Sequence, residues 1–153
     1  MQSIYWVITR NCTQRCDHCY IGSGPGEESL SEADVERIVE HLPQQVGQVI
    51  IAGGETLTVK PLLFHALKAL SAKYEGATRF LMQTNGDLLD ERIIAELFER
   101  GLSRIDVSSI DSYHHNRHDR ERIDAFFRAC GATYLEFPIM VDEEKGRQGF
   151  NFI

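Results

Sequence analysis

Cysteine is scarce in this chain of 153 residues, which holds only four of them. Long apolar runs are also missing, since no stretch approaches the roughly 20 residues that a membrane span needs. The N-terminus does not have the basic-then-apolar layout of a secretory signal. Basic residues are few, 16 against 23 acidic ones, which gives a net charge of −7. These features argue against membrane and general nucleic-acid partners and predict a cytoplasmic protein, where disulfides are rare.

Three of the four cysteines, Cys12, Cys16 and Cys19, nevertheless lie within eight positions. In a reducing compartment, such clustering indicates metal or redox chemistry rather than disulfides. The C-x3-C-x2-C spacing supplies three thiolates, one fewer than the ligands of a closed structural zinc or iron–sulfur site. An iron–sulfur cluster of four irons held in this way would keep one iron open for a small molecule. Cys130 lies far away and is predicted to be a small buried hydrophobic residue.

Two other interpretations of the clustered cysteines stay open at this point. A zinc ion bound by the three thiolates and by His18, or by a histidine of residues 114–118, would make a Cys3His site. Alternatively, positions i, i+4 and i+7 share one face of a helix, which would make the cysteines core residues, although polar neighbours flank that face. His114 and His118 are four apart and would bind a metal only on a helix; such a run is more often a polar loop.

Short apolar segments alternate with amphipathic ones along most of the chain. Strands are predicted over residues 4–9, 48–52, 79–84, 104–109 and 133–140. Between them, apolar residues recur at helical spacing in 30–42, after Pro61, after Asp90 and over roughly 120–130. Ser31 and Asp90 are predicted N-caps. Crossovers of this length predict an α/β fold with a parallel sheet, which is either doubly wound or curled into a whole or partial (β/α) barrel.

Polar or glycine-rich motifs follow four of the predicted strands. The clustered cysteines follow the first strand, and the later motifs are Gly53-Gly54-Glu55, Thr84-Asn85-Gly86 and Ser109-Ile110-Asp111. Because ligands bind at the carboxyl ends of strands in parallel α/β folds, we expect one site at this edge. Taken alone, each of the three later motifs is also typical of a turn or a strand end, with Glu55 in water.

The combination of motifs resembles the radical S-adenosylmethionine (SAM) superfamily over roughly residues 4–140. "CTQRCDHC" is similar to the family's three-cysteine signature, with His18 at the usually aromatic position before the third cysteine. "GGE" resembles its glycine-rich motif, although this chain continues with Thr56 where proline is common. "TNG", "SID" and "HDRER", which contains Arg122, are most similar to the branch of peptide-modifying enzymes with auxiliary clusters.

The resemblance implies two cofactors, a 4Fe–4S cluster on Cys12, Cys16 and Cys19, and SAM bound to the open iron. It implies that the "GGE" motif holds the amino group of the SAM methionine and that Arg122 pairs with its carboxylate. For Arg122, the alternative is a solvated helix arginine. The ribose would be contacted by residues after the third and fourth strands. The implied cofactor-binding residues are His18, Gly53, Gly54, Glu55, Asn85, Ser109, Asp111 and Arg122.

The implied activity is reductive cleavage of SAM to a 5′-deoxyadenosyl radical that takes a hydrogen atom from a substrate. The branch suggests a peptide as this substrate, and an electron donor such as flavodoxin or ferredoxin as a partner. Two rival functions stay open: a small activating protein that makes a radical on a partner enzyme, and a non-catalytic zinc or iron–sulfur binding module. The sequence identifies neither the substrate nor the residues that would act on it.

The family's core domain is normally a partial barrel, and residues 1–153 supply about five of its six strands. The polar stretch 141–149 and the short segment 150–153 leave no room for a sixth strand with its helix. The fifth strand would then be an open edge with unpaired backbone groups. We therefore expect either a piece of a longer protein or an enzyme whose open edge is covered by a further domain or subunit.

Overall fold

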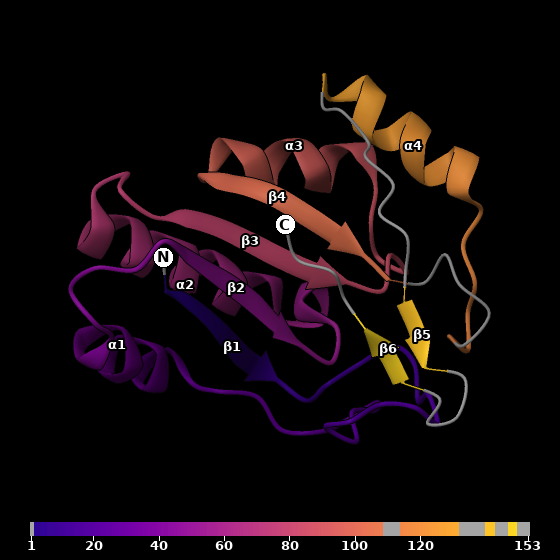
Figure 1. Ribbon diagram of the computed structural model, residues 1–153, viewed down its shortest axis with the longest axis horizontal. Coiled ribbons are helices and arrows are strands. Elements are labelled where there is room, and N and C mark those ends of the chain that lie inside the picture. Colours follow the sequence, from indigo (N-terminus) through magenta and orange to yellow (C-terminus); the bar gives the residue numbers. More distant parts are fainter. Residues whose placement is uncertain (1, 109–113, 132–139, 143–146, 150–153) are drawn as a thin grey trace.

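The computed structural model describes residues 2–108, 114–131, 140–142 and 147–149. Its main sheet has four parallel strands in the order β1-β2-β3-β4 (Figure 1). They are β1 (Ser3–Thr9), β2 (Gln48–Gly53), β3 (Arg79–Thr84) and β4 (Leu102–Val107). The α/β class is therefore confirmed. Because each strand pairs with the next one in sequence and the order does not reverse, this sheet favours a barrel over a doubly wound fold.

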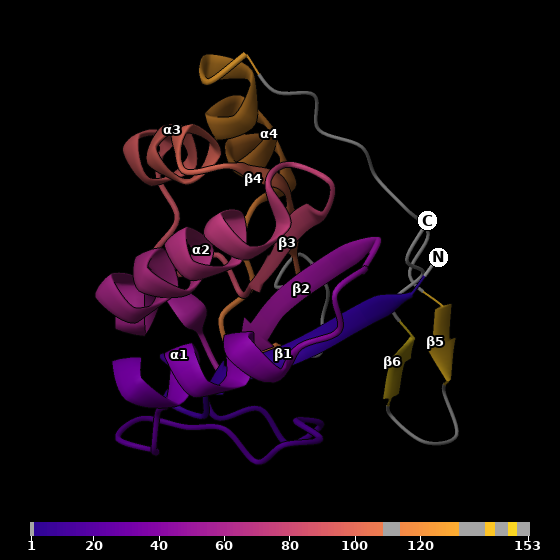
Figure 2. The same ribbon diagram turned by 90° about the vertical axis from the view of Figure 1, so that its left-hand side faces the viewer.

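Helices cover the sheet on one face (Figure 2). The helices are α1 (Glu32–His41), α2 (Lys60–Tyr74), α3 (Glu91–Glu99) and α4 (Arg120–Ala129), and a 3₁₀ turn, η1 (Thr56–Val59), precedes α2. Helix α1 packs against α2, and α3 packs against α4. In the part of the chain that the structure describes, no helix is long and apolar enough to cross a membrane.

The helix starts follow from their caps. Ser31 accepts a hydrogen bond from the backbone N–H of Asp34, whose carboxylate accepts one from the backbone N–H of Ser31, so the predicted cap of α1 is a complete capping box. Asp90 caps α3 as predicted, by accepting from Ile93 N at 2.8 Å. Helix α4 begins at Arg120, and the side chain of the preceding Asp119 caps it by accepting from Glu121 N at 2.9 Å.

The core lies between the sheet and the helices. The predicted apolar stripes face inward, and burying each such side chain contributes about 1.5–3 kcal/mol. The largest completely buried apolar side chains are Ile8, Val35, Val49, Ile51, Leu63, Leu67, Leu70, Met82, Ile94, Leu97 and Ile123. This packing holds the carboxyl ends of the four strands in a fixed relation to one another.

The largest differences from the predicted elements lie in the second half of the chain. Strand β4 begins at Leu102, two residues earlier than expected. Of the predicted fifth strand, 133–139 lie outside the described residues, and Met140 belongs to β5 (Met140–Asp142), which pairs antiparallel with β6 (Arg147–Gly149). Residues 141–142 and 147–149, which belong to the predicted polar stretch, therefore form strands that the sequence did not predict. Backbone pairing does not require apolar side chains, so an apolar pattern does not mark these strands.

Candidate functional site

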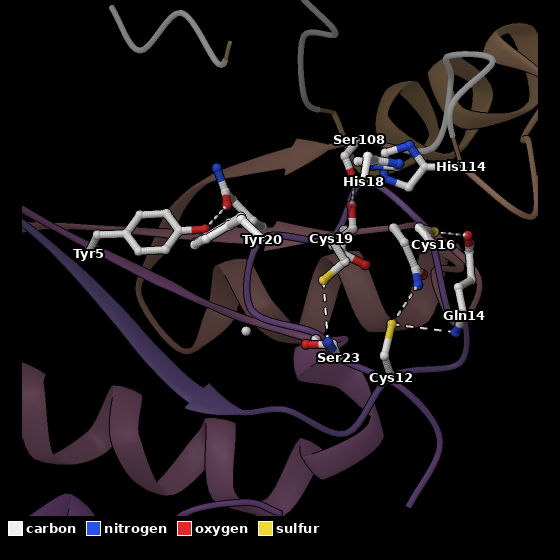
Figure 3. Close-up of a pocket in the computed structure, with 15 residues that line it drawn as sticks. Tyr5, Cys12, Gln14, Cys16, His18, Cys19, Tyr20, Ser23, Ser108 and His114 are labelled. Carbon is white, nitrogen blue, oxygen red and sulfur yellow. Dashed lines mark hydrogen bonds between the residues drawn. The ribbon is translucent and has the colours of Figure 1, made fainter. Parts of the chain in front are cut away.

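A cavity of about 510 Å³ opens at the carboxyl ends of the parallel strands (Figure 3). All three clustered cysteines line it, and each of the other strand ends contributes a part of its wall. These contributions come from Gly53, Gly54, Thr84, Asn85 and Ser108. The volume falls within the roughly 300–1,000 Å³ of small-molecule sites. The residues that follow the four strands therefore meet at one cavity in the described part of the chain.

The cysteine segment is an irregular loop. Cys12 N donates to Gly24 O at 3.1 Å, and Cys19 N donates to Cys16 O at the same distance, so turns fold the backbone around the three residues. Each of the three cysteines is partly exposed. The alternative of three core cysteines on one helix face is therefore wrong.

Three N–H groups lie close to the cysteine sulfurs. Gln14 N is 3.4 Å from Cys12 Sγ, Asn85 Nδ2 is 3.6 Å from the same sulfur, and Ser23 N is 3.3 Å from Cys19 Sγ. Burial raises the pKa of the Cys12 thiol, because a thiolate is costly away from water. A bound metal displaces the thiol proton, and N–H donors then stabilise the negative sulfur.

The two glycines of the second motif let the end of β2 pack directly on the segment that leads into the cysteine loop. A Cβ at Gly53 would lie 2.3 Å from Thr9 O, and one at Gly54 would lie 2.3 Å from Asn11 O. Gly54 N and Glu55 N donate to the same two carbonyls, at 2.9 and 2.8 Å. Because Gly53 and Gly54 have no Cβ, the backbone of residues 9–11 can pack directly against them. The same two glycines also line the cavity.

Glu55 has no exposed surface, which contradicts the alternative of a solvated turn residue. Its carboxylate accepts hydrogen bonds from Leu57 N at 3.0 Å, Thr84 Oγ1 at 2.9 Å and Asn85 N at 2.7 Å. Burial raises the pKa of Glu55 to about 7, although these donors act in the opposite direction. The side chain therefore ties the end of β2 to that of β3. Its predicted contact with the amino group of SAM stays a prediction.

A second carboxylate that the sequence motifs do not predict, the largely buried Asp87, follows the "TNG" motif directly. It accepts hydrogen bonds from Thr13 Oγ1, from Gln14 Nε2 at 3.0 Å, from Asn116 Nδ2 at 3.3 Å and from His118 Nε2 at 2.7 Å. Burial alone would raise the pKa of Asp87, but these hydrogen bonds outweigh it and lower the pKa. The sequence signal that points to Asp87 is its position just after β3, because the carboxyl ends of parallel strands are where ligands bind.

The histidines have partners other than a metal ion. His118 bonds to Asp87, and the ring of His114 lies edge-on to that of His18, with centroids 4.9 Å apart at the cavity. Residues 114–118 are not helical, which removes the basis for a metal pair of His114 and His118. Among the described ranges, no three His, Cys, Asp or Glu side chains are placed to hold one metal ion. The predicted alternative of a Cys3His zinc site therefore has no support.

The three thiols fit an iron–sulfur cluster better than a single ion. A mononuclear zinc ion holds its thiolates about 2.3 Å from one point, whereas each cysteine of a 4Fe–4S cluster binds a different iron. Here the thiols line one cavity from separate points of a loop, and N–H donors already lie next to two of the sulfurs. Such outer contacts are characteristic of built metal sites.

Of the remaining predicted cofactor-binding residues, Ser109, Asp111 and Arg122, the structure describes only Arg122. Arg122 does not line the cavity; it is exposed on α4, with its guanidinium carbon 5.2 Å from the centroid of the Phe126 ring. The alternative of a solvated helix arginine describes this position, and the contact with the SAM carboxylate stays a prediction. Ser109 and Asp111 lie outside the described residues. The preceding residue, Ser108, lines the cavity.

Two tyrosines at the cavity are not among the predicted cofactor-binding residues. Tyr5 and Tyr20 line it while remaining 41% and 71% exposed, and the hydroxyl of Tyr5 donates to Gln83 Oε1. Burial and the neighbouring Tyr20 raise the pKa of Tyr5 well above its ordinary value. Cys130 lies away from this group, at the end of α4, where its thiol donates to Glu91 O at 3.1 Å.

The family model of the Radical SAM superfamily matches residues 6–132 of the chain. The chain belongs to the radical SAM superfamily. Members of this superfamily are enzymes, and they use a 4Fe–4S cluster and SAM. The resemblance that the sequence motifs predicted is confirmed at the level of the superfamily, while the peptide-modifying branch stays a prediction.

Curated relatives share the family core. The chain is 32% identical to Fe-coproporphyrin III synthase of Methanosarcina barkeri over 109 residues, covering 69% of this chain and 26% of that protein. It is 30% identical to AdoMet-dependent heme synthase of the same organism over 126 residues, covering 78% and 34%. It is 37% identical to probable GTP 3′,8-cyclase of Archaeoglobus fulgidus over 104 residues, covering 67% and 33%. The chain therefore spans about a quarter to a third of the length of these relatives.

Solved structures confirm the fold. The crystal structure of BtrN in complex with AdoMet and 2-DOIA aligns with a TM-score of 0.68 at 18% identity, covering 88% of this chain and 55% of that one. The structure of anSMEcpe with bound AdoMet aligns with a TM-score of 0.58 at 17% identity, covering 86% and 42%. Likeness at this identity concerns the fold alone, and it confirms the predicted α/β fold with a partial barrel.

Proposed function

We propose that the chain is a radical SAM core in which Cys12, Cys16 and Cys19 hold a 4Fe–4S cluster and the adjoining cavity binds SAM. The observation that carries this proposal is that the three thiols and the backbone of Gly53 and Gly54 line the same cavity. When bound, the reduced cluster and SAM would supply a 5′-deoxyadenosyl radical that removes a hydrogen atom from the substrate.

The chain's own residues would position the cofactors and shield them from water. The cysteine loop supplies the cluster ligands, and the backbone at Gly53 and Gly54 is the proposed contact for the amino group of SAM. Ser109 and Asp111 remain the proposed contacts for the ribose. Glu55 would act from behind this surface, because its buried carboxylate joins the ends of β2 and β3. His18 would form part of the wall, where its ring meets that of His114.

These contacts do not identify the substrate. Relatives of similar identity are named as synthases of heme-type compounds and as a GTP cyclase, so similarity in the core does not select one substrate class. An electron donor such as flavodoxin or ferredoxin, and a further domain or subunit that covers the open edge of the barrel, remain the proposed partners. A cytoplasmic location agrees with this chemistry, since exposed clusters are easily oxidised.

Anaerobic reconstitution with iron and sulfide tests the proposal. We expect about four irons per chain, absorbance near roughly 400 nm, and 5′-deoxyadenosine when dithionite and SAM are added. The matched control is Cys16→Ala, which should give neither cluster nor product. A preparation that binds only zinc, or one that holds the cluster without cleaving SAM, would contradict the proposal. Co-purification of a large partner that acquires a radical would instead favour the activating protein.

A further inference from the structure

We propose that Asn85 raises the reduction potential of the cluster by donating a hydrogen bond from its side-chain amide to the Cys12 sulfur. This inference rests on the proposed function, because it concerns the same cluster. The amide nitrogen lies 3.6 Å from Cys12 Sγ, and only 6% of the Asn85 surface is exposed. Its position after β3 places it on the cavity wall opposite the cysteine loop.

The orientation of the Asn85 amide is fixed by its other partners. Its oxygen accepts from Asp87 N at 2.9 Å, which leaves the NH₂ group to face the cysteine loop. That group also donates to Thr13 Oγ1 at 3.0 Å, and the backbone N–H of Asn85 donates to Glu55 Oε2 at 2.7 Å. A reversed amide would bring oxygen to the sulfur and NH₂ to another donor. The donor therefore points at the sulfur before any cofactor binds.

The electrostatic consequence follows from the change in charge on reduction. One added electron makes the cluster and its ligand sulfurs more negative, so a donor to a sulfur stabilises the reduced form more than the oxidised form. Burial strengthens this effect, because water does not compete for the donor. Of the three N–H donors to cysteine sulfurs described above, those of Gln14 and Ser23 belong to the backbone. Asn85 is thus the one that substitution can remove.

The test is a redox titration of the reconstituted full chain, followed by the EPR signal of the reduced cluster. In Asn85→Leu, we expect the ratio of reduced to oxidised cluster at a fixed electrode potential to fall about fivefold, in line with the loss of one ordinary hydrogen bond. Asn85→Asp retains an oxygen for Asp87 N but loses the NH₂ donor and adds a charge, so the fall should be at least as large. If the leucine variant does not assemble a cluster, the aspartate variant decides.

Thr13→Val is the matched control. It removes the contacts of Thr13 with Asn85 and Asp87 but keeps the N–H···S contact, so the potential should stay that of the parent. A parental potential in both Asn85 variants, or an equal fall in Thr13→Val, would overturn the inference. If the parent neither assembles a cluster nor cleaves SAM, the proposed function fails. If the parent assembles a cluster and cleaves SAM but both Asn85 variants keep the parental potential, the proposed function stands and only the role of Asn85 fails.

Discussion

His118 Nε2 lies 2.7 Å from Asp87 Oδ1, and this hydrogen bond joins the loop after β3 to the loop before α4. Thr13 and Gln14 donate to the same carboxylate, so the cysteine loop is attached to both. Only 10% of the Asp87 side chain and 13% of the His118 side chain are exposed. The loop that would carry the cluster is therefore held by residues far from it in sequence, from the loops after β3 and before α4.

Replacing Asp87 by Asn should lower the free energy of unfolding at pH 7 by about 1–3 kcal/mol, because several of the side chains that donate to this carboxylate would lose their acceptor. The pKa of Asp87 is lowered in the folded chain. The stabilisation is therefore present above the unfolded value of about 3.9 and is lost as pH falls through the folded pKa. Urea unfolding of parent and variant at several pH values measures this, and the difference should shrink in acid.

The control for Asp87→Asn is Asp124→Asn, which breaks a pair with the exposed Arg128 on α4. Such a surface pair contributes about 0.5 kcal/mol or less. An equal effect of the two substitutions would contradict the special position of Asp87.

Glu55→Gln should reveal a pH dependence of the opposite sign. Burial raises the pKa of Glu55 from its ordinary 4.5 to about 7. Because the pKa of Glu55 is higher in the folded chain, its contribution to the free energy of unfolding is complete below the pKa of the unfolded chain. This contribution is lost as the pH rises toward the pKa of the folded chain. Relative to the glutamine variant, the parent should lose about 3 kcal/mol between those two pH values. Thermal or urea unfolding across this pH range would measure the difference in the free energy of unfolding between parent and variant. A difference that does not vary with pH would refute the raised pKa of Glu55.

Gly54→Ala should destabilise the chain by about 1–3 kcal/mol through overpacking, since its Cβ would meet the carbonyl of Asn11. We also expect weaker SAM binding at unchanged iron content, because the displaced backbone lines the cavity. Gly26→Ala is the comparison: its Cβ meets nothing within 4 Å, and its φ of 79° costs about 1–2 kcal/mol by itself. SAM affinity in that variant should equal that of the parent, and equal affinity in both variants would count against the glycine motif.

Single replacement of Cys12, Cys16 or Cys19 by Ala should abolish cluster assembly, measured as iron and sulfide per chain. Cys130→Ala should keep the full cluster, because Cys130 lies at the end of α4 and its thiol donates to Glu91 O at the start of α3. Its cost should be confined to about 1 kcal/mol in the free energy of unfolding. Loss of iron from Cys130→Ala, with the other cysteines intact, would show that the ligand set is misassigned.

The sequence predicted the regular elements well because their signals are local. The capping box at Ser31 and the stripes of α2 and α3 are set by neighbours within a turn or two, and the structure reproduces them. The strand-end motifs were sufficient to place the cysteines, Gly53 and Gly54 on one cavity, since parallel strands share an edge.

What the sequence could not supply was the use of each polar side chain. Glu55 and Asp87 both follow strands, yet one is buried beneath the motif and the other receives donors from two distant loops. Such networks depend on contacts across the fold rather than on spacing along the chain. The hairpin of β5 and β6 escaped prediction for a related reason, because its backbone pairing is not marked by an apolar pattern.

The contacts of Asp87 also have a consequence for protein synthesis. Thr13 donates to Asp87, 74 residues further along the chain, and Gln14 also accepts from the backbone N–H of Asn116, 102 residues further along. Both partners leave the ribosome long after the cysteines. Since contacts of such separation form late, the three thiols should lack their final arrangement until the segment up to residue 118 has been made. We therefore expect thiol labelling of stalled nascent chains to remain rapid until residue 118 has emerged and then to slow. Iron and sulfide would then have to reach the cysteines after residue 118 has emerged, and the three thiols would need protection until that point.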